Sequence, residues 1–354
     1  MEERLFDKIL TAVKKPDGSI KKRIQERLDN LTKPPGSLGR LEEAALKYAV
    51  IRGAVNPVLR RKTILTFVGD HGIAEEGVSA YPKEVTRQMV FNFLRGGAAV
   101  NVLARHIRAG VRIVDVGVDY DFGKTEGLIS KKVRRGTGNF LKTPAMTKKE
   151  AVMAIEAGIE TAIAETECGV DIVGVGDMGI GNSSSAAGIT AVITEKPVEE
   201  ITGRGTGIDD AGLRHKIAVI KSAIALHKPK QDDPIDIMRK VGGLEIGAIA
   251  GAIIGCASRK IPIVLDGFIA TAGALIAFLL NKNTVKYLFA SHLSKEKGHI
   301  AALRYLGLKP LLDLHLRLGE GTGACLAINL IEAGVRILNE MATFDGAGVS
   351  RNDL

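Results

Sequence analysis

VDIVGVGDMGIGNSSSAAG, residues 170–188, joins a continuous apolar run to a glycine-rich turn and a polar segment. An apolar run without alternation is typical of a strand that is buried on both faces of a parallel sheet. The polar segment predicts the start of a helix, because Asn and Ser side chains suit the unpaired N–H groups of a first turn. The stretch therefore predicts a strand–turn–helix unit of an α/β protein.

The same pattern recurs along the chain, and helix-like segments separate the apolar runs. The other runs are TILTFVG (63–69), VRIVDVG (111–117), IPIVLDG (261–267) and KYLFASH (286–292). The helix-like segments include PKEVTRQMVFNFLRG (82–96), TKKEAVMAIEAGIETAIAE (147–165) and DAGLRHKIAVIKSAIALH (210–227). We therefore expect an α/β fold, a parallel sheet with helices on both faces.

The two ends of the chain are expected to be helical. IKKRIQERLDNL (20–31) and LGRLEEAALKYAVIRG (38–53) carry apolar residues at helical spacing, as does a final segment at about 321–340. We expect a large α/β catalytic domain over 62–318, and a small helical domain formed by 1–61 together with 319–354.

Composition and charge narrow the class of protein. The chain has 354 residues, of which 45% are hydrophobic and 25% charged, as in globular enzymes. The net charge of +9 comes from scattered basic clusters without interleaved aromatic residues. This favours a plain solvated basic surface, with attraction of small anionic substrates as the secondary interpretation, and we expect no nucleic-acid partner.

We expect neither a membrane span nor a secretory signal. Residues 261–280 are long enough to cross a bilayer, but Asp266 and Gly267 divide them into a strand, a turn and a core helix. Gly251 and Gly255 in the preceding segment indicate close helix packing. The three cysteines share no metal-like spacing, and the charged N-terminus does not resemble a signal peptide, so a cytoplasmic location is expected.

Two glycine-rich stretches have the properties of an anion site. Gly179 and Gly181 free the backbone before Asn182, Ser183 and Ser184, where N–H groups of a helix start point outward. Gly205 and Lys216 lie in a second such stretch, and Lys216 is a possible counter-charge for a phosphate. The alternative is an ordinary N-cap with a solvated lysine. Neither stretch fits an ATP or a dinucleotide motif.

GDHGIAEEGVSAYP, residues 69–82, carries three acids and a histidine. No second histidine lies at the spacing that a helical metal site needs, so we expect no metal. The loop is better suited to shaping an aromatic-ligand pocket, bordered by Ser79, Tyr81, Gln88 and Met89. Plain core packing is the alternative for Met89.

LRLGEGTGA, residues 316–324, places Glu320 between two glycines at the head of an apolar run. A carboxylate there can complement the dipole of the helix that follows, or it can be a base held in a pocket. The residue pattern by itself leaves both interpretations open.

Taken together, these stretches resemble the nicotinate-nucleotide–dimethylbenzimidazole phosphoribosyltransferase family over nearly the whole chain. The resemblance rests on KPPGSLGRLE (33–42), GDHGIAEEGVSAYPKEVTRQMV (69–90), NFLRGGAAVNVLAR (92–105), GDMGIGNSSSAAG (176–188), LDGFIATAGAL (265–275), SHLSKEKGH (291–299) and LRLGEGTGACLA (316–327).

The resemblance implies a reaction. The family moves the phosphoribosyl group of nicotinate mononucleotide to 5,6-dimethylbenzimidazole. This releases nicotinate and gives α-ribazole 5′-phosphate for the lower ligand of cobalamin. It also implies a Rossmann-like sheet with a smaller helical domain from both chain ends, a homodimer, and no cofactor or metal. A nucleotide- or benzimidazole-binding protein without activity and a nicotinate mononucleotide hydrolase remain the alternatives.

The resemblance further implies residue roles. Glu320 falls on the family's general base, and Asp177 stands where the family commonly has a glutamate that assists it. The nucleotide would be held by Gly179, Gly181, Asn182, Ser183, Ser184, Gly205, Lys216, Ser291 and Ser294. The benzimidazole would be held by Ser79, Tyr81, Gln88, Met89 and Leu318. Asp177 is one methylene shorter than glutamate, which puts its assisting role in doubt.

Overall fold

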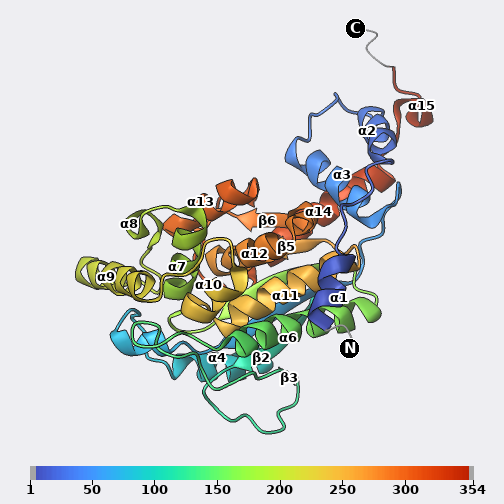
Figure 1. Ribbon diagram of the computed structural model, residues 1–354. Coiled ribbons are helices and arrows are strands. Elements are labelled where there is room, and N and C mark those ends of the chain that lie inside the picture. Colours follow the sequence, from blue (N-terminus) through green and yellow to red (C-terminus); the bar gives the residue numbers. More distant parts are fainter. Residues whose placement is uncertain (1–4, 351–354) are drawn as a thin grey trace.

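The computed structural model describes residues 5–350 and has helices on both faces of one sheet (Figure 1). Its seven strands are all parallel, in the order β3-β2-β1-β4-β5-β6-β7. The strands are β1 (Lys62–Gly69), β2 (Gly110–Gly117), β3 (Leu128–Ser130), β4 (Ile172–Met178), β5 (Ile263–Leu265), β6 (Leu288–His292) and β7 (Pro310–Leu312). The predicted α/β class and parallel sheet are confirmed, and the strand order is that of a doubly wound fold.

The predicted helices are also present. The α-helices are α1 (Leu5–Ala12), α2 (Lys21–Asp29), α3 (Arg40–Arg52), α4 (Val85–Leu94), α5 (Ala99–His106), α6 (Lys148–Glu167), α7 (Asn182–Thr194), α8 (Val198–Ile201), α9 (Asp210–His227), α10 (Pro234–Val241), α11 (Leu244–Ser258), α12 (Phe268–Leu280), α13 (Lys297–Leu306), α14 (Thr322–Glu340) and α15 (Phe344–Ala347). Two 3₁₀ turns, η1 (Gly72–Glu76) and η2 (Lys282–Tyr287), complete the set.

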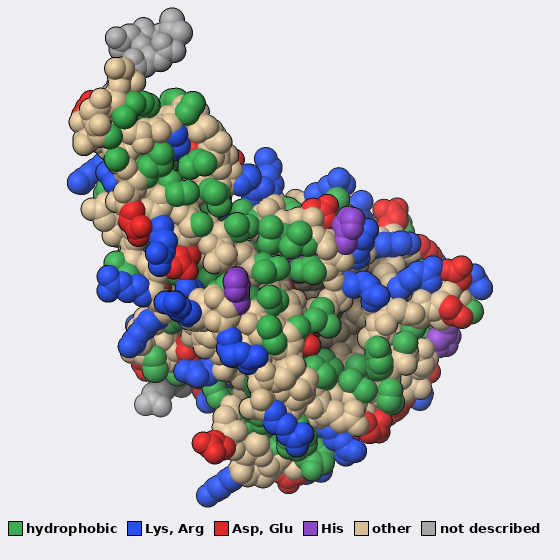
Figure 2. Space-filling model, turned by 180° about the vertical axis from the view of Figure 1, so that it is seen from behind, with side chains coloured by type: hydrophobic (Ala, Val, Ile, Leu, Met, Phe, Trp, Pro, Cys, Tyr) green, Lys and Arg blue, Asp and Glu red, His purple; other side chains and the backbone are tan. Residues whose placement is uncertain are grey.

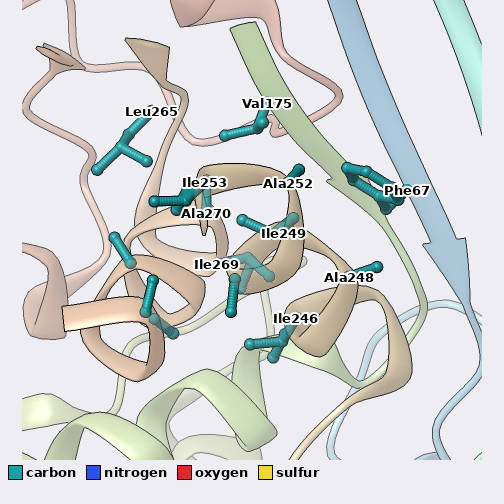
Figure 3. Close-up of a cluster of buried hydrophobic side chains, with 14 of the residues drawn as sticks. Phe67, Val175, Ile246, Ala248, Ile249, Ala252, Ile253, Leu265, Ile269 and Ala270 are labelled. Atoms are coloured by element: carbon teal, nitrogen blue, oxygen red, sulfur yellow. The ribbon is translucent and has the colours of Figure 1, made fainter. Parts of the chain in front are cut away.

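Strand β4 shows how the two faces are covered. Side chains alternate along a strand, so Gly174 and Val175 face opposite sides of the sheet. A Cβ on Gly174 would meet Ala324 and Ile328 of α14, at 3.0 and 3.3 Å. Val175 instead faces the buried side chains of α11, beside Phe67 of β1 (Figure 3). Helices α11 and α14 therefore lie on opposite faces of the sheet.

Helix α11 is apolar nearly all round because it is covered twice. It packs on β1, β2 and β4, and α6 packs against its outer side. The close approach depends on glycine, since a Cβ on Gly251 would lie 1.8 Å from the carbonyl oxygen of Ile155. The predicted close helix packing at this residue is confirmed.

The apolar segment 261–280 forms strand β5 and the buried helix α12, as predicted. No helix among residues 5–350 has the length and apolar character needed to cross a membrane. On the face shown in Figure 2, Lys and Arg side chains are scattered among acidic ones, and they do not form a single patch.

A second, smaller hydrophobic cluster lies away from the sheet (Figure 1). It joins α2, α3 and the C-terminal end of α14 through Ile24, Leu28, Leu31, Ala45, Ala49 and Leu338. Helix α1 packs instead on α6 and α11, so the first helix lies against the large α/β part. The proposed domain boundaries stay a prediction.

Candidate active site

Strands β1 and β4 are neighbours in the sheet, and the strand order reverses between them. In doubly wound folds, ligands bind beyond the carboxyl ends of the strands at this reversal. Here β1 ends at Gly69 and β4 ends at Met178. The loop that follows β1 (69–82) and the glycine-rich turn that follows β4 therefore both lie at this edge.

A cavity of about 290 Å³ opens at the same edge. It is lined by Tyr81, Asp177, Asn182, Ser183, Gly205, Thr206, Gly267, Phe268, Ile269, His292, Ser294, Glu296, Arg317, Leu318 and Gly319. Two hollows of about 600 and 620 Å³ lie elsewhere, but neither is lined by a strand residue. We therefore take the cavity at the strand ends as the candidate site.

The turn after β4 begins α7 and forms one wall of the cavity. Gly181 has a φ of 95°, and a Cβ on Gly179 would lie 2.2 Å from the carbonyl oxygen of Gly69. Both positions therefore need glycine. The Asn182 amide donates to the Asp177 carboxylate at 2.8 Å. Ser184 is fully buried, and its hydroxyl has no partner among the described residues.

Lys216 does not itself line the cavity, but its ammonium group lies against the lining residue Ser183. Its side chain is only 1% exposed, and its ammonium group donates to the Ser183 hydroxyl at 2.7 Å. Burial lowers the pKa of Lys216 to about 8, and the nearby Glu296 opposes this effect. Glu296 in turn accepts from the backbone N–H of Gly205 at 3.0 Å. A buried ammonium group beside a hydroxyl and a helix start is suited to binding phosphate.

Glu320 lies in a turn of three consecutive residues with left-handed backbone, Gly319, Glu320 and Gly321, with φ values of 88°, 66° and 104°. The turn rests directly on β4, because a Cβ on Gly176 would lie 2.2 Å from the backbone nitrogen of Gly321. The backbone of Glu320 also donates to the carbonyl of Asp177 at 3.1 Å and accepts from Thr66 at 2.8 Å. Glycines in the strand and in the turn therefore bring Glu320 to the strand ends.

The Glu320 carboxylate is held at the start of α5. It is 5% exposed, and it accepts from the backbone N–H of Val100 at 3.1 Å. Burial raises the pKa of Glu320, and the N–H groups of Val100 and Ala99 partly oppose this effect. Glu320 itself does not line the cavity, but Leu318 and Gly319 do.

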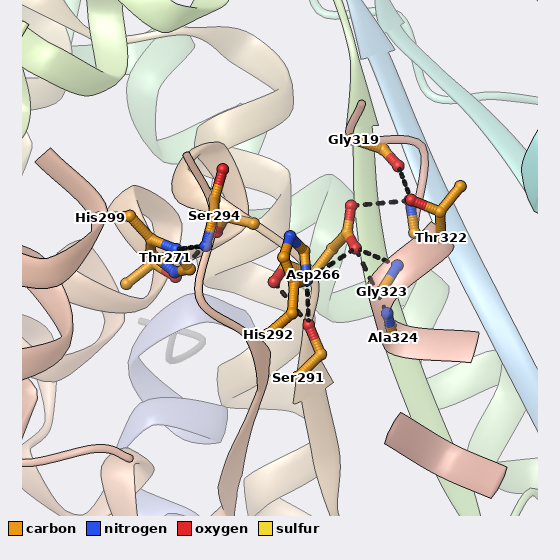
Figure 4. A network of polar contacts seen from close by, with 12 residues as sticks. Asp266, Thr271, Ser291, His292, Ser294, His299, Gly319, Thr322, Gly323 and Ala324 are labelled. Carbon is orange, nitrogen blue, oxygen red and sulfur yellow. Dashed lines mark hydrogen bonds and ion pairs between the residues drawn. The ribbon is translucent and has the colours of Figure 1, made fainter. Parts of the chain in front are cut away.

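The acid that complements the start of α14 is Asp266, on the loop after β5 (Figure 4). Its carboxylate accepts from the N–H groups of Gly321, Gly323 and Ala324 at 3.0, 2.7 and 3.3 Å. Burial raises the pKa of Asp266 to about 7, while these N–H groups lower it. This role of Asp266 was not predicted from the sequence, although an acid at the end of an apolar run was the available signal.

Asp177 shares this acidic environment. Its pKa is raised well above the usual range, first by burial and then by Asp266 and Glu245, while the Asn182 amide opposes the shift. Glu245 forms a buried pair with His71, whose Nε2 lies 2.6 Å from its Oε1. Residues 5–350 contain no group of three or more His, Cys, Asp or Glu side chains that could hold a metal ion.

The residues expected to bind the aromatic base lie at different depths. Tyr81 and Leu318 line the cavity. The hydroxyl of Ser79 lies 3.1 Å from that of Thr206, which is a lining residue. Met89 is half-buried against the core, and Gln88 is exposed on α4 outside the lining. The roles of Gln88 and Met89 stay predictions.

The two serines expected to bind the nucleotide also differ. Ser294 lines the cavity, whereas Ser291 is fully buried and donates to the carbonyl of Asp266 at 2.7 Å. Several lining residues from other segments were not predicted from the sequence: Thr206, Gly267, Phe268, Ile269, His292, Glu296 and Arg317.

A doubly wound sheet with a phosphate-type site and a buried carboxylate at the strand reversal defines the class as a nucleotide-binding α/β enzyme. A family profile described as "Phosphoribosyltransferase" matches residues 13–349. The chain belongs to the nicotinate-nucleotide–dimethylbenzimidazole phosphoribosyltransferase family.

Individual relatives agree over the whole length. The chain is 56% identical over 346 residues to the nicotinate-nucleotide–dimethylbenzimidazole phosphoribosyltransferase of Geobacter sp. (strain M21), covering 98% of this chain and 99% of the relative. It is 55% identical to the enzyme of the same name from Geobacter sulfurreducens, covering 99% of each chain. The crystal structure of CobT from Thermus thermophilus has a TM-score of 0.91 and 48% identity, and the match covers 94% of this chain and 99% of that chain.

Proposed function

We propose that the protein transfers the 5-phosphoribosyl group of nicotinate mononucleotide to 5,6-dimethylbenzimidazole or a related base. The products are nicotinate and α-ribazole 5′-phosphate, and the second of these is used in making the lower ligand of cobalamin. The observation that carries the proposal is the buried Glu320 carboxylate beside a cavity that has a cationic phosphate-type end. Full-length identity above 50% to enzymes of this name supports it.

The nucleotide phosphate would bind where α7 begins. The ammonium group of Lys216, the hydroxyl of Ser183 and the N–H groups of the helix start all suit an anion. This end of the proposed nucleotide site comprises Gly179, Gly181, Asn182, Ser183, Ser184, Gly205 and Lys216, with Ser291 and Ser294 towards the ribose. Ser79, Tyr81, Gln88, Met89 and Leu318 would surround the incoming base.

The chemistry needs one proton acceptor. One ring nitrogen of the benzimidazole forms a bond to C1′ of the ribose, while the other nitrogen loses its proton to the Glu320 carboxylate. The bond between C1′ and the pyridinium nitrogen breaks, and its electrons return to the ring, so nicotinate leaves without an acid. Attack from the face opposite the leaving group inverts the configuration from β to α.

Asp177 has a secondary role in this proposal. Burial and the neighbouring carboxylates favour its neutral form, so it is a weaker candidate for the base than Glu320. When Glu320 is replaced, an ionised Asp177, which lines the cavity, can accept the proton instead. No metal or redox cofactor is needed in the proposed steps, and we expect a cytoplasmic homodimer.

The test is the release of nicotinate from nicotinate mononucleotide, with and without dimethylbenzimidazole. Transfer predicts release that depends on the added base, together with α-ribazole 5′-phosphate as product. Release that ignores the base would indicate a hydrolase. Binding of both molecules without release would indicate a non-catalytic protein.

A further inference from the structure

His292, the last residue of β6, lies between the two ends of the cavity. On one side it neighbours Asp266, which holds the Glu320 turn (Figure 4). On the other side the chain runs through Ser294 to Glu296, which holds Gly205 beside Lys216. In the proposed function, the reacting base occupies the end beside the Glu320 turn, and the phosphate occupies the end beside Gly205 and Lys216. The ribose must therefore lie near His292.

The proton positions on His292 follow from its neighbour. The Ser291 hydroxyl has one proton, and it donates this proton to the carbonyl oxygen of Asp266 at 2.7 Å. The same oxygen lies 2.9 Å from Nδ1 of His292, so it must accept there, and Nδ1 carries the hydrogen. Burial lowers the pKa of His292 to about 4, so the ring is neutral at physiological pH. Nε2 is then left with a lone pair.

That lone pair is available to a ligand. Nε2 of His292 has no hydrogen-bond partner among residues 5–350, and His292 lines the cavity beside Gly267. The nearby side chains that line this stretch of the cavity include the hydroxyl of Ser294 and the carboxylate of Glu296. A neutral acceptor in the middle of the cavity suits a group that donates a hydrogen bond and carries no charge, such as a hydroxyl.

We infer that Nε2 of His292 accepts a hydrogen bond from a ribose hydroxyl of the bound nucleotide, and so selects ribosyl over deoxyribosyl substrates. This inference rests on the proposed function. It also assigns Ser291 a place in the site, because Ser291 fixes the tautomer that makes Nε2 an acceptor. Ser291 is fully buried, so it acts through His292 and does not itself touch the nucleotide.

Two substitutions of His292 test the roles of its two ring nitrogens separately. His292→Asn keeps a donor near the position of Nδ1 but removes the group at Nε2. His292→Gln places an amide oxygen near the position of Nε2. We expect His292→Asn to weaken binding of nicotinate mononucleotide about 10-fold, the usual effect of one lost hydrogen bond to a buried partner, and His292→Gln to recover most of the loss.

The deciding measurement compares nucleotides that lack one hydroxyl. Dissociation constants of nicotinate mononucleotide and its 2′-deoxy and 3′-deoxy analogues are measured by calorimetry, without benzimidazole, for the wild type and both variants. For the one analogue that lacks the partner hydroxyl, we expect His292→Asn to leave the dissociation constant unchanged. That analogue thereby identifies the hydroxyl that His292 binds. Equal losses for all three nucleotides, or no loss for any, would overturn the inference.

A spectroscopic readout on the unmodified protein covers the case in which the variants do not fold. With ¹⁵N-labelled histidine, the Nε2 signal of His292 should be that of an unprotonated nitrogen, and should move on addition of nicotinate mononucleotide. A protonated Nε2 in the free protein would refute the inference. Base-dependent nicotinate release is scored separately, so failure of the proposed function is distinguishable from failure of the His292 contact.

Discussion

Replacing Glu320 by Gln tests the proposed base with little change in shape. The amide keeps an oxygen that can accept from the Val100 N–H, now 3.1 Å from the carboxylate, so the start of α5 stays bonded. The variant loses only the charge–dipole interaction between the carboxylate and the start of α5, which contributes about 0.3–1 kcal/mol to the free energy of unfolding. Relief of a buried charge offsets it, because burial already raises the pKa of Glu320. We expect a change in unfolding free energy within about 1 kcal/mol.

The expected loss of activity is much larger. Removal of a general base costs about 10²–10⁴-fold in rate, or roughly 3–5 kcal/mol in the activation free energy. The assay is single-turnover release of nicotinate at saturating dimethylbenzimidazole from pH 5 to 9. In the wild type the rate should fall as pH drops through the raised pKa of Glu320, since only the ionised carboxylate accepts a proton. This acidic limb should be absent in the Gln variant.

A matched control is Glu340→Gln, at the exposed C-terminal end of α14, the helix that follows the Glu320 turn; it should leave the rate unchanged. Asp177 can accept the proton when Glu320 is absent, so the measurement is repeated on a variant that combines Glu320→Gln with Asp177→Asn. A rate within about 3-fold of wild type in this double variant would refute the reasoning about a carboxylate base, since 3-fold is far below the range for general-base loss.

Three further changes test the phosphate end, the support of the Glu320 turn and the core. Lys216→Met should raise KM for nicotinate mononucleotide by roughly 10- to 100-fold with little change in kcat, and an unchanged KM would contradict a phosphate contact. In the wild type, affinity for the nucleotide should weaken above about pH 8, where the ammonium group loses its proton. Asp266→Asn should lower the free energy of unfolding by about 1–3 kcal/mol at pH 5, because the amide places a donor against backbone N–H groups. Burial raises the pKa of Asp266 to about 7, so the stability that this group gives the wild type is present at low pH and lost as pH rises through 7. In denaturant melts, the difference in unfolding free energy between the wild type and Asp266→Asn should therefore be smaller at pH 8 than at pH 5. A larger difference at pH 8 would contradict this reasoning. Gly251→Ala should destabilise by more than about 2 kcal/mol, because its Cβ would lie 1.8 Å from a carbonyl of α6, whereas Gly18→Ala, with nothing within 4 Å, should be near neutral in the same melts.

The sheet was largely predictable because its strands are buried on both faces. Runs such as TILTFVG and VDIVGVG are mostly apolar and do not alternate, and they became β1 and β4 within a residue or two. Strands β3 and β7 escaped prediction because three residues of ordinary composition carry no periodicity. The glycine turns that hold Asn182 and Glu320 were visible for the opposite reason: left-handed backbone favours glycine, which is conspicuous in a sequence.

The amino-acid sequence by itself determined the α/β class, the glycine-shaped turns and the acid at position 320, because these depend on neighbours within a few residues. Only the tertiary structure decided that Asp266, 55 residues from Gly321, complements the start of α14, and that Glu320 is held by α5. It also paired His71 with Glu245, across 174 residues. Such contacts follow from the order of strands in the sheet, and the local pattern of a chain does not specify which strand ends meet.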